Sequence, residues 1–244
     1  MENTTGNQAA VEIKDIRKSL GRMPVLHGVS LTLQKGQVWG LVGPNGCGKT
    51  TLFRTLLGYL QPDSGTTTVL GRSNPDDYRR HIGIALDDNG FDPHLSGRAN
   101  LAAVATIAGV PDLEVRDWID AFDMGPAIRR QPATYSYGMR KRLGLIAAFM
   151  SKRPVLLLDE PANGLDVAAQ AMLRRYIIDE ASAGTTVFMS NHSMHDVEQT
   201  CTHIAMMHKG VILARGTLEE VVEGYTNLED SFIKRTQGAR NAIR

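Results

Sequence analysis

The segment Val38-Trp39-Gly40-Leu41-Val42-Gly43-Pro44-Asn45-Gly46-Cys47-Gly48-Lys49-Thr50 decides the fold class. Its first five residues are mostly apolar and predict a buried strand. The next eight match G-x-x-x-x-G-K-[ST] at every position, and helical character follows from Thr50 to Gly58. Glycines let consecutive N–H groups point at one anion, so this order is typical of a phosphate-binding loop. A chance match in a glycine-rich turn is the alternative, and the strand and helix around the loop argue against it.

The side chains at the end of the loop are the expected nucleotide ligands. Lys49 supplies a point charge for the β- and γ-phosphates, and the Thr50 hydroxyl is suited to ligate Mg²⁺. The other residues that we expect around ATP in this segment are Gly43, Pro44, Asn45, Gly46, Cys47, Gly48 and Thr51.

Cys47 is also expected to be a reactive thiol, because a thiolate is stabilised in an anion-binding loop at a helix N-terminus. The alternative is a buried, inert Cys47, with Cys201 the reactive cysteine. These two cysteines are far apart in the sequence and make neither a disulfide framework nor a zinc site. That usage is typical of a reducing compartment.

A second motif is the aliphatic run Val155-Leu156-Leu157-Leu158, which ends in Asp159 and Glu160. Ligands of a parallel α/β sheet lie at the carboxyl ends of its strands. Asp159 is therefore expected beside the Mg²⁺ held by Thr50, and Glu160 is placed to orient or deprotonate the attacking water. A strand running into an acidic surface loop is the alternative, and the phosphate loop counts against it.

The rest of the chain indicates an α/β domain over residues 11–235, with flexible tails at 1–10 and 236–244. Residues from about 91 to 151 lack strand alternation and predict an inserted helical subdomain, in which Asp112 caps a helix with Val115, Trp118, Ile119 and Phe122 on one face. One further helix is expected over Leu218 to Lys234. Strands are expected at 11–14, 30–34, 38–42, 66–70, 82–86, 155–158, 185–189, 204–208 and 211–214, the last two forming a hairpin at Lys209-Gly210.

Composition limits the function classes. The 27 Lys and Arg balance the 26 Asp and Glu to a net charge of +1, so no nucleic-acid partner is expected. The longest uncharged apolar stretch, Leu101 to Val110, is about half of the ~20 residues that a membrane helix needs. The polar start of the chain is not a secretory signal. We therefore expect a cytoplasmic protein.

Further segments resemble the ATP-binding cassette (ABC) ATPases, and the resemblance covers about Val11 to Arg235. Tyr135-Ser136-Tyr137-Gly138-Met139 stands where that family has its Leu-Ser-Gly-Gly-Gln signature, with Ser136 and Gly138 matching and Tyr137 and Met139 departing. A helix N-cap at Ser136 is the alternative for this segment. The resemblance implies a RecA-like P-loop NTPase core with an antiparallel β portion and an inserted helical subdomain.

Two segments after Glu160 extend the resemblance. Asn163-Gly164-Leu165-Asp166 stands at the position of the family's D-loop, which lies at a dimer contact. His192 matches the switch histidine that touches the γ-phosphate. A structural role for His192 is the alternative. A metal site formed by His192 and His195 is not favoured, because no Cys or Asp cluster accompanies them.

Two positions depart from the family pattern. Leu20 stands where an aromatic residue usually stacks on adenine, so it offers apolar contact without a π-face. Asp87 stands where a glutamine is usual, and a carboxylate there can still contact Mg²⁺ or water. The metal-binding side of the predicted site therefore comprises Thr50, Asp159 and Asp87.

By resemblance, the chain hydrolyses ATP with Mg²⁺ and powers a transporter. A second ABC ATPase chain, identical or different, would face it head to tail, with Ser136, Tyr137, Gly138 and Met139 reaching the partner's nucleotide. Separate transmembrane permease subunits would dock near Asp87 to His94 and hold the chain at the inner face of the cell membrane.

The S-x-G-M form of the signature resembles that of drug-resistance and peptide-export ATPases, which favours an exporter. An importer ATPase is the alternative within the class. A soluble ABC ATPase acting on nucleic acid or ribosomes would usually need two cassettes, zinc sites or a long coiled-coil insertion. A non-hydrolytic nucleotide-binding regulator is disfavoured because Glu160 and His192 are both present.

Overall fold

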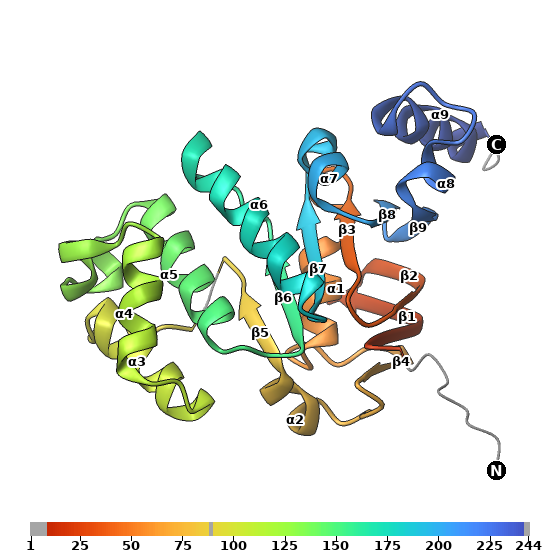
Figure 1. Cartoon of the computed structure of the whole chain (residues 1–244). Helices are drawn as coiled ribbons and strands as arrows, with labels where there is room; N and C mark the ends of the chain where they lie inside the picture. Colours follow the sequence, from red (N-terminus) through yellow and green to blue (C-terminus); the bar gives the residue numbers. More distant parts are fainter. Residues whose placement is uncertain (1–8, 88–89, 242–244) are drawn as a thin grey trace, which may run out of the picture.

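A computed structural model describes residues 9–87 and 90–241, and a six-stranded sheet forms the centre of this part of the chain (Figure 1). The strand order is β5-β6-β7-β3-β8-β9, with every neighbouring pair parallel except the β8–β9 hairpin. The strands are β3 (Val38–Val42), β5 (Ile82–Ala85), β6 (Val155–Asp159), β7 (Thr186–Asn191), β8 (His203–His208) and β9 (Val211–Thr217). Because β3, β6 and β7 are buried along their whole length, their largely apolar sequences suit a sheet covered on both faces.

A smaller antiparallel sheet has the order β2-β1-β4. Its strands are β1 (Val11–Leu20), β2 (Met23–Leu33) and β4 (Ser64–Val69). Helix α1 (Lys49–Leu56) joins the two sheets, because Leu52 and Phe53 are fully buried in a core to which both sheets contribute. The Phe53 ring lies 4.8 Å from that of Phe188 on β7. This packing fixes α1 directly after β3.

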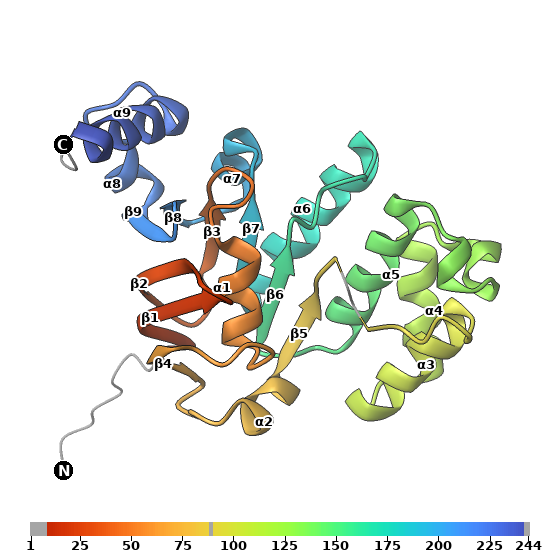
Figure 2. The same ribbon diagram turned by 180° about the vertical axis from the view of Figure 1, so that it is seen from behind.

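Helices cover the opposite face of the large sheet (Figures 1 and 2). They are α6 (Val167–Ser182) and α7 (Met194–Thr200), and their buried side chains belong to a second core together with Val38 and Val42 of β3. Trp39 and Leu41 belong to the first core, so alternate residues of β3 serve opposite faces of the sheet.

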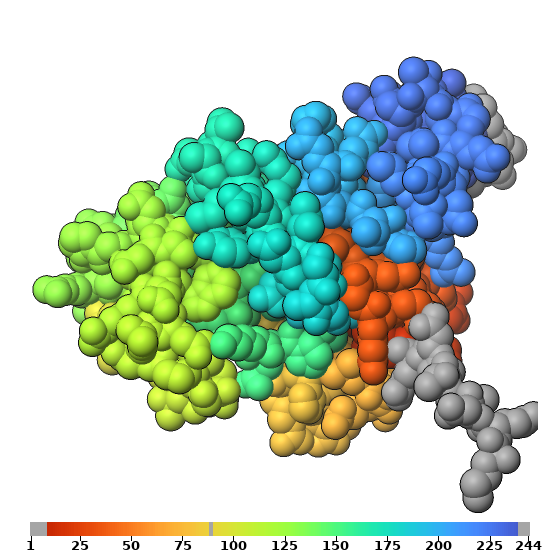
Figure 3. Space-filling model, viewed as in Figure 1, coloured from red at the N-terminus to blue at the C-terminus, as the bar shows by residue number. Residues whose placement is uncertain are grey.

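A group of helices forms one end of the molecule, drawn in green in Figure 3. It comprises α3 (Gly97–Ala108), α4 (Asp112–Ala121), η2 (Gly125–Arg129), η3 (Pro132–Thr134) and α5 (Tyr137–Met150). The rings of Trp118, Phe122, Phe149 and Tyr176 pack together and join this group to α6. We call these helices, from α3 to α5, the helical region.

The fold class expected from the sequence is confirmed, and three details differ. Asp112 is the first residue of α4 and does not cap it: Pro111 holds the cap position, and the Asp112 carboxylate pairs with Arg116 at 3.1 Å instead. The helix expected over Leu218 to Lys234 is two helices, α8 (Leu218–Val222) and α9 (Leu228–Asn241), because Gly224 adopts a φ of 78° between them.

The C-terminal helix also extends beyond its expected end. Residues 236–241 were expected in a flexible tail but belong to α9, whose run of residues after Lys234 contains no proline to stop it. Residues 242–244 and most of the expected N-terminal tail, 1–8, lie outside the described residues.

The remaining short elements connect β4 to β5. They are α2 (Pro75–Tyr78) and η1 (Arg79–His81). Within the residues that the structure describes, none of the helices has the length and apolar character needed to cross a bilayer.

Candidate functional site

The loop between β3 and α1 takes the conformation that its glycines allow. Gly46 has a φ of 76°, and Gly48, which precedes the first residue of α1, has a φ of 112°. L-residues with side chains rarely adopt these values. Gly43 is required for another reason, since a Cβ there would lie 2.2 Å from the Met207 carbonyl oxygen. The loop can therefore curl at the N-terminus of α1, where N–H groups favour an anion.

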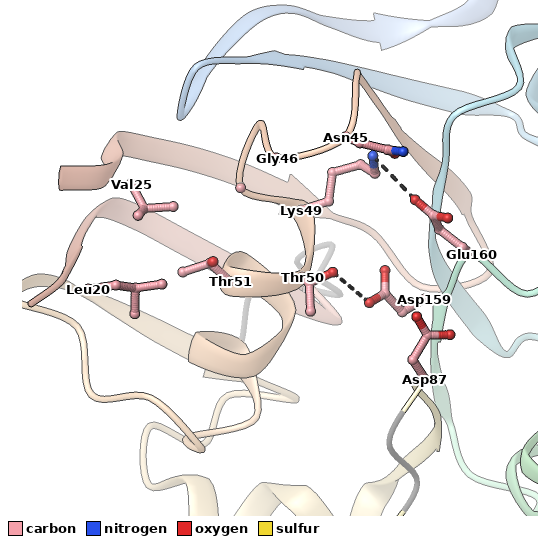
Figure 4. Close-up of a pocket in the computed structure, with 11 residues that line it drawn as sticks. Leu20, Val25, Asn45, Gly46, Lys49, Thr50, Thr51, Asp87, Asp159 and Glu160 are labelled. Atoms are coloured by element: carbon pink, nitrogen blue, oxygen red, sulfur yellow. Dashed lines mark hydrogen bonds and ion pairs between the residues drawn. The ribbon is translucent and has the colours of Figure 1, made fainter. Parts of the chain in front are cut away.

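Lys49 and Thr50 extend from the first turn of α1 toward the end of β6 (Figure 4). The buried Lys49 ammonium donates to the Gly43 carbonyl at 2.8 Å and lies 3.5 Å from a carboxylate oxygen of Glu160. The Thr50 hydroxyl donates to Asp159 at 2.8 Å. The two motifs found in the sequence thus form one site.

Ser190 at the end of β7 orients the two carboxylates at the end of β6. Its hydroxyl accepts a hydrogen bond of 3.0 Å from the Glu160 N–H and donates one to the Asp159 side chain. Glu160 has a φ of 45°, a left-handed conformation that is unusual for a residue other than glycine. Backbone strain of this kind is concentrated at functional sites. This turn sends the adjacent carboxylates to different partners, Asp159 to Thr50 and Glu160 to Lys49.

His192 and Asn163 flank the Glu160 carboxylate. The Asn163 amide donates to it, and the half-exposed His192 ring has Nδ1 3.5 Å from the same oxygen. Both residues were selected from the sequence, and the structure brings them to the same side chain.

These residues border a pocket of about 460 Å³, within the ~300–1,000 Å³ range of small-molecule sites. Leu20 lines it and is 47% exposed, which leaves an apolar surface for a flat ring. Val25, across the β1–β2 hairpin, was not predicted from the sequence. The lining residues are Leu20, Val25, Asn45, Gly46, Gly48, Lys49, Thr50, Thr51, Asp87, Asp159 and Glu160.

Gly43, Pro44 and Cys47 belong to the loop but not to the pocket lining. For Cys47 the expected stabilised thiolate is wrong. The side chain is buried, and this burial raises the pKa of the thiol even though the Lys49 charge acts in the opposite direction. Burial also raises the pKa of Cys201. The alternative of an inert Cys47 therefore agrees with the structure.

The signature residues lie at the start of α5 and do not line the pocket of their own chain, as far as the described residues go. Ser136 is exposed and caps α5 by accepting a hydrogen bond of 3.2 Å from the Met139 N–H. Gly138 packs closely on the Gly164 carbonyl, which a Cβ at residue 138 would approach to 2.4 Å. The sulfur of Met139 accepts a hydrogen bond from Arg130.

The segment from Asn163 to Asp166 has a defined contact at each position within its own chain. Gly164, with a φ of 75°, lies under the Tyr137 ring, and the Leu165 side chain is buried. Asp166 caps α6 by accepting from the Ala169 N–H at 2.9 Å, and it also pairs with Arg142.

Asp87 follows β5 and reaches the pocket from the side of the helical region. Its carboxylate lies 2.6 Å from the Lys141 ammonium and accepts a hydrogen bond of 3.1 Å from the Tyr137 hydroxyl. Partial burial favours a higher pKa for Asp87, but Lys141 and Tyr137 outweigh it and hold the pKa below its usual range. Burial and the Asp87 charge raise the pKa of Tyr137 to about 12.

With this geometry in view, the relatives of the chain can be compared. A family model described as "ABC transporter" matches residues 26–163, more than half of the chain. The chain belongs to the ABC transporter family. As the ATPase of such a transporter, it binds ATP and hydrolyses it to ADP and phosphate, and the hydrolysis is coupled to transmembrane transport.

Several curated ABC relatives match most of the chain. The lantibiotic transport ATP-binding protein SrtF of Streptococcus pyogenes is 32% identical over 222 residues, which cover 91% of this chain and 95% of that protein. The bacitracin transport ATP-binding protein BcrA of Enterococcus faecalis is 31% identical, covering 86% and 70%. The daunorubicin/doxorubicin resistance ATP-binding protein DrrA of Streptomyces peucetius is 33% identical, covering 87% and 66%.

The fold is shared with solved structures. One described as the ATP binding subunit of an ABC transporter has a TM-score of 0.86, covering 93% of this chain and 99% of that one at 24% identity. This likeness supports the fold of the ABC ATPase.

Sequence analysis missed three residues at the site. Ser190 and Lys141 escaped notice because each acts through a contact with a distant segment, and Val25 because its partner Leu20 was the residue matched to the family pattern. A polar residue at the end of a predicted strand was the available signal for Ser190.

Proposed function

We propose that this ABC ATPase drives an exporter and that the pocket between α1 and β6 is its hydrolytic site. The observation that carries the proposal is the convergence of Lys49 and Glu160, at 3.5 Å, from the phosphate loop and the end of β6. In this arrangement Lys49 and the N–H groups of the loop bind the phosphates of ATP. Leu20 and Val25 contact the adenine through apolar surface.

Mg²⁺ would be held by Thr50 and Asp159. A hydroxyl and a carboxylate lie 2.8 Å apart here, and oxygen donors of this kind are the ligands that Mg²⁺ takes together with substrate phosphates. The ion would neutralise phosphate charge. Asp87 lines the same pocket but is already paired with Lys141, so we place it beside this pair of ligands as a contact for water or for the ion.

Glu160 is proposed as the general base. Ser190 holds its backbone and Asn163 its side chain, so the carboxylate is positioned before the attacking water arrives. His192, 3.5 Å from that carboxylate, is placed to contact the γ-phosphate and Glu160 together. The cleavage then needs one water, whose proton passes to Glu160 as its oxygen attacks phosphorus.

The complete site is proposed to form between two cassettes. Ser136 is exposed at the N-terminus of α5, outside its own chain's pocket, where N–H groups and a hydroxyl suit a phosphate. In a head-to-tail dimer, Ser136, Tyr137, Gly138 and Met139 would face the nucleotide of the other chain. The segment from Asn163 to Asp166 would lie at the dimer contact.

The permease subunits are proposed to dock between β5 and α3, and so to hold the chain at the inner face of the cell membrane. A groove there is lined by Phe91, Val104 and Ile107, and Ile107 is 80% exposed. The exporter direction is supported by the relatives whose names refer to lantibiotic transport, bacitracin transport and daunorubicin/doxorubicin resistance.

The test is to express the chain together with its permease in a drug-sensitive host. Growth is measured against a panel of peptide antibiotics and anthracyclines, with Glu160→Gln as the matched control. An exporter protects the host against at least one compound, and only when Glu160 is intact. Sensitivity that increases with the active protein indicates uptake and overturns the export direction.

A further inference from the structure

Lys141 of α5 is a buried lysine whose ammonium reaches two different strand ends. It lies 2.6 Å from the Asp87 carboxylate, after β5, and donates at 2.7 Å to the backbone carbonyl of Asp159, at the end of β6. The Lys141 side chain is only 5% exposed, whereas that of Asp87 is 63% exposed. The cation is therefore anchored by the fold, and the carboxylate is the partner at the pocket surface.

The charges around the pocket are arranged in two pairs. Asp87, Asp159 and Glu160 all line it, and ATP would bring further negative charge to the same space. Lys49 faces Glu160, and Lys141 faces Asp87. Without Lys141, a carboxylate would stand uncompensated beside a polyphosphate, which like-charge repulsion disfavours.

The surroundings of Lys141 keep the pair together. The Tyr137 hydroxyl donates to the same Asp87 oxygen that Lys141 contacts, and the ammonium lies 5.9 Å from the centre of the Tyr137 ring. Asp87 thus receives two donors from one turn of α5, the helix that begins with the signature.

We propose that Lys141 is a positioning residue of the ATPase site, which neutralises Asp87 and ties it to the end of β6 so that a carboxylate can stand where the family usually has a glutamine. The inference rests on the proposed function, because it assumes that MgATP binds in this pocket. Lys141 acts through Asp87 and does not itself contact the nucleotide. It also links the helical region to the strand that bears Asp159 and Glu160.

The sharpest variant is Lys141→Gln, which keeps a donor for the Asp159 carbonyl and removes the charge. We expect the dissociation constant of a fluorescent ATP analogue, measured with Mg²⁺, to rise by about tenfold or more, since hydrogen bonds to charged groups are worth about that much. In the double variant Lys141→Gln/Asp87→Asn no carboxylate needs compensation. Its affinity should return to within about threefold of the original chain.

Lys152→Met is the matched control, because Lys152 also pairs with a carboxylate, Glu114, but on the exposed surface of the helical region. Its nucleotide affinity should be unchanged. The inference is overturned if Lys141→Gln binds nucleotide as Lys152→Met does, or if the double variant is as weak as the single one. A purely structural role for Lys141 predicts the latter result, because Asp87→Asn restores charge balance and no lost contact.

Two further measurements keep the outcomes separate. Lys49→Ala must weaken binding of the analogue; if it does not, the proposed site itself is at fault rather than the role of Lys141. Circular dichroism checks that each variant is folded. If Lys141→Gln alone does not fold, a folded double variant supports the charge pair and an unfolded one contradicts it.

Discussion

The Lys49 ammonium lies 3.5 Å from the Glu160 carboxylate, although the two residues belong to segments far apart in the sequence. Lys49 is buried and also donates to the Gly43 carbonyl of its own loop. Both charges are therefore balanced within the protein. Binding of a phosphate chain to Lys49 would compete for this contact and release the Glu160 carboxylate toward water.

Glu160→Gln should separate ATP binding from hydrolysis. The amide keeps the shape of the side chain and its contact with Asn163 but cannot accept a proton, so turnover should fall by about 10²–10⁴-fold. The dissociation constant for MgATP should stay close to that of the original protein. Phosphate release and nucleotide binding are measured on the same preparation, and a turnover near the original value contradicts the assignment of Glu160 as the base.

Two inactive variants should restore activity when mixed, if the site is shared between chains. Lys49→Ala removes the phosphate charge, and Ser136→Asp puts a carboxylate against the partner's γ-phosphate while still capping α5. In a mixed dimer both lesions fall in one composite site and the other stays intact. Part of the ATPase activity should therefore return on mixing.

The choice of Ser136 in that experiment follows from the structure. Gly138→Asp would place a Cβ 2.4 Å from the Gly164 carbonyl of the same chain and so disturb its own loop. A mixture that forms mixed dimers but stays as inactive as its components counts against the shared site, unless both sites must act together. A single polypeptide with two linked cassettes, one carrying both lesions, distinguishes these cases.

Both cysteines should react slowly with a thiol-alkylating reagent in the folded protein. Cys47 and Cys201 are buried, and burial raises the pKa of each thiol, so few thiolates are present at neutral pH. Alkylation followed by mass spectrometry in increasing urea should show both thiols reacting only as the chain unfolds. Rapid modification of Cys47 without denaturant would contradict this account.

Phe122→Ala should destabilise the helical region. Phe122 is fully buried, and its ring lies 5.6 Å from that of Tyr176 on α6, so truncation leaves a cavity worth about 3–5 kcal/mol. Leu113→Ala is the control on the same helix, since Leu113 is exposed, and its effect should be within about 0.5 kcal/mol. Urea unfolding of both variants measures the difference, and equal stabilities would refute the packing argument.

His203 should make the stability of the protein depend on pH below neutrality. Burial lowers the pKa of His203 and outweighs the opposing Glu220 charge, and the ring stacks on Trp39 at 5.0 Å. The neutral form is favoured in the folded state, so its contribution is complete above the unfolded pKa of about 6.5 and is lost as pH falls through the lower folded pKa. Unfolding free energies at pH 7.5 and 5 should therefore differ less for His203→Gln than for the original chain. His81, whose pKa is also lowered, contributes equally to both proteins.

Local patterns predicted most of the fold. The glycine spacing in the phosphate loop, the aliphatic runs of β3 and β6, and the periodic apolar face of α4 each express a requirement of the backbone or of burial within a few residues. The same locality explains the errors. The left-handed Gly224 divides the C-terminal helix, and the fate of Asp112 depended on Arg116 and on Arg98 of the preceding helix.

The sequence by itself determined the chemistry of this protein, because the phosphate loop, the acidic end of β6 and the signature are each contiguous segments whose residue types state their ligands. Only the tertiary structure decided which groups share a charge. The pairing of Asp87 with Lys141, the burial of Cys47 and the wall formed by Leu20 and Val25 depend on segments that the fold brings together from distant positions. Electrostatic and desolvation energies depend on distances in space, and a pattern along the chain does not specify them.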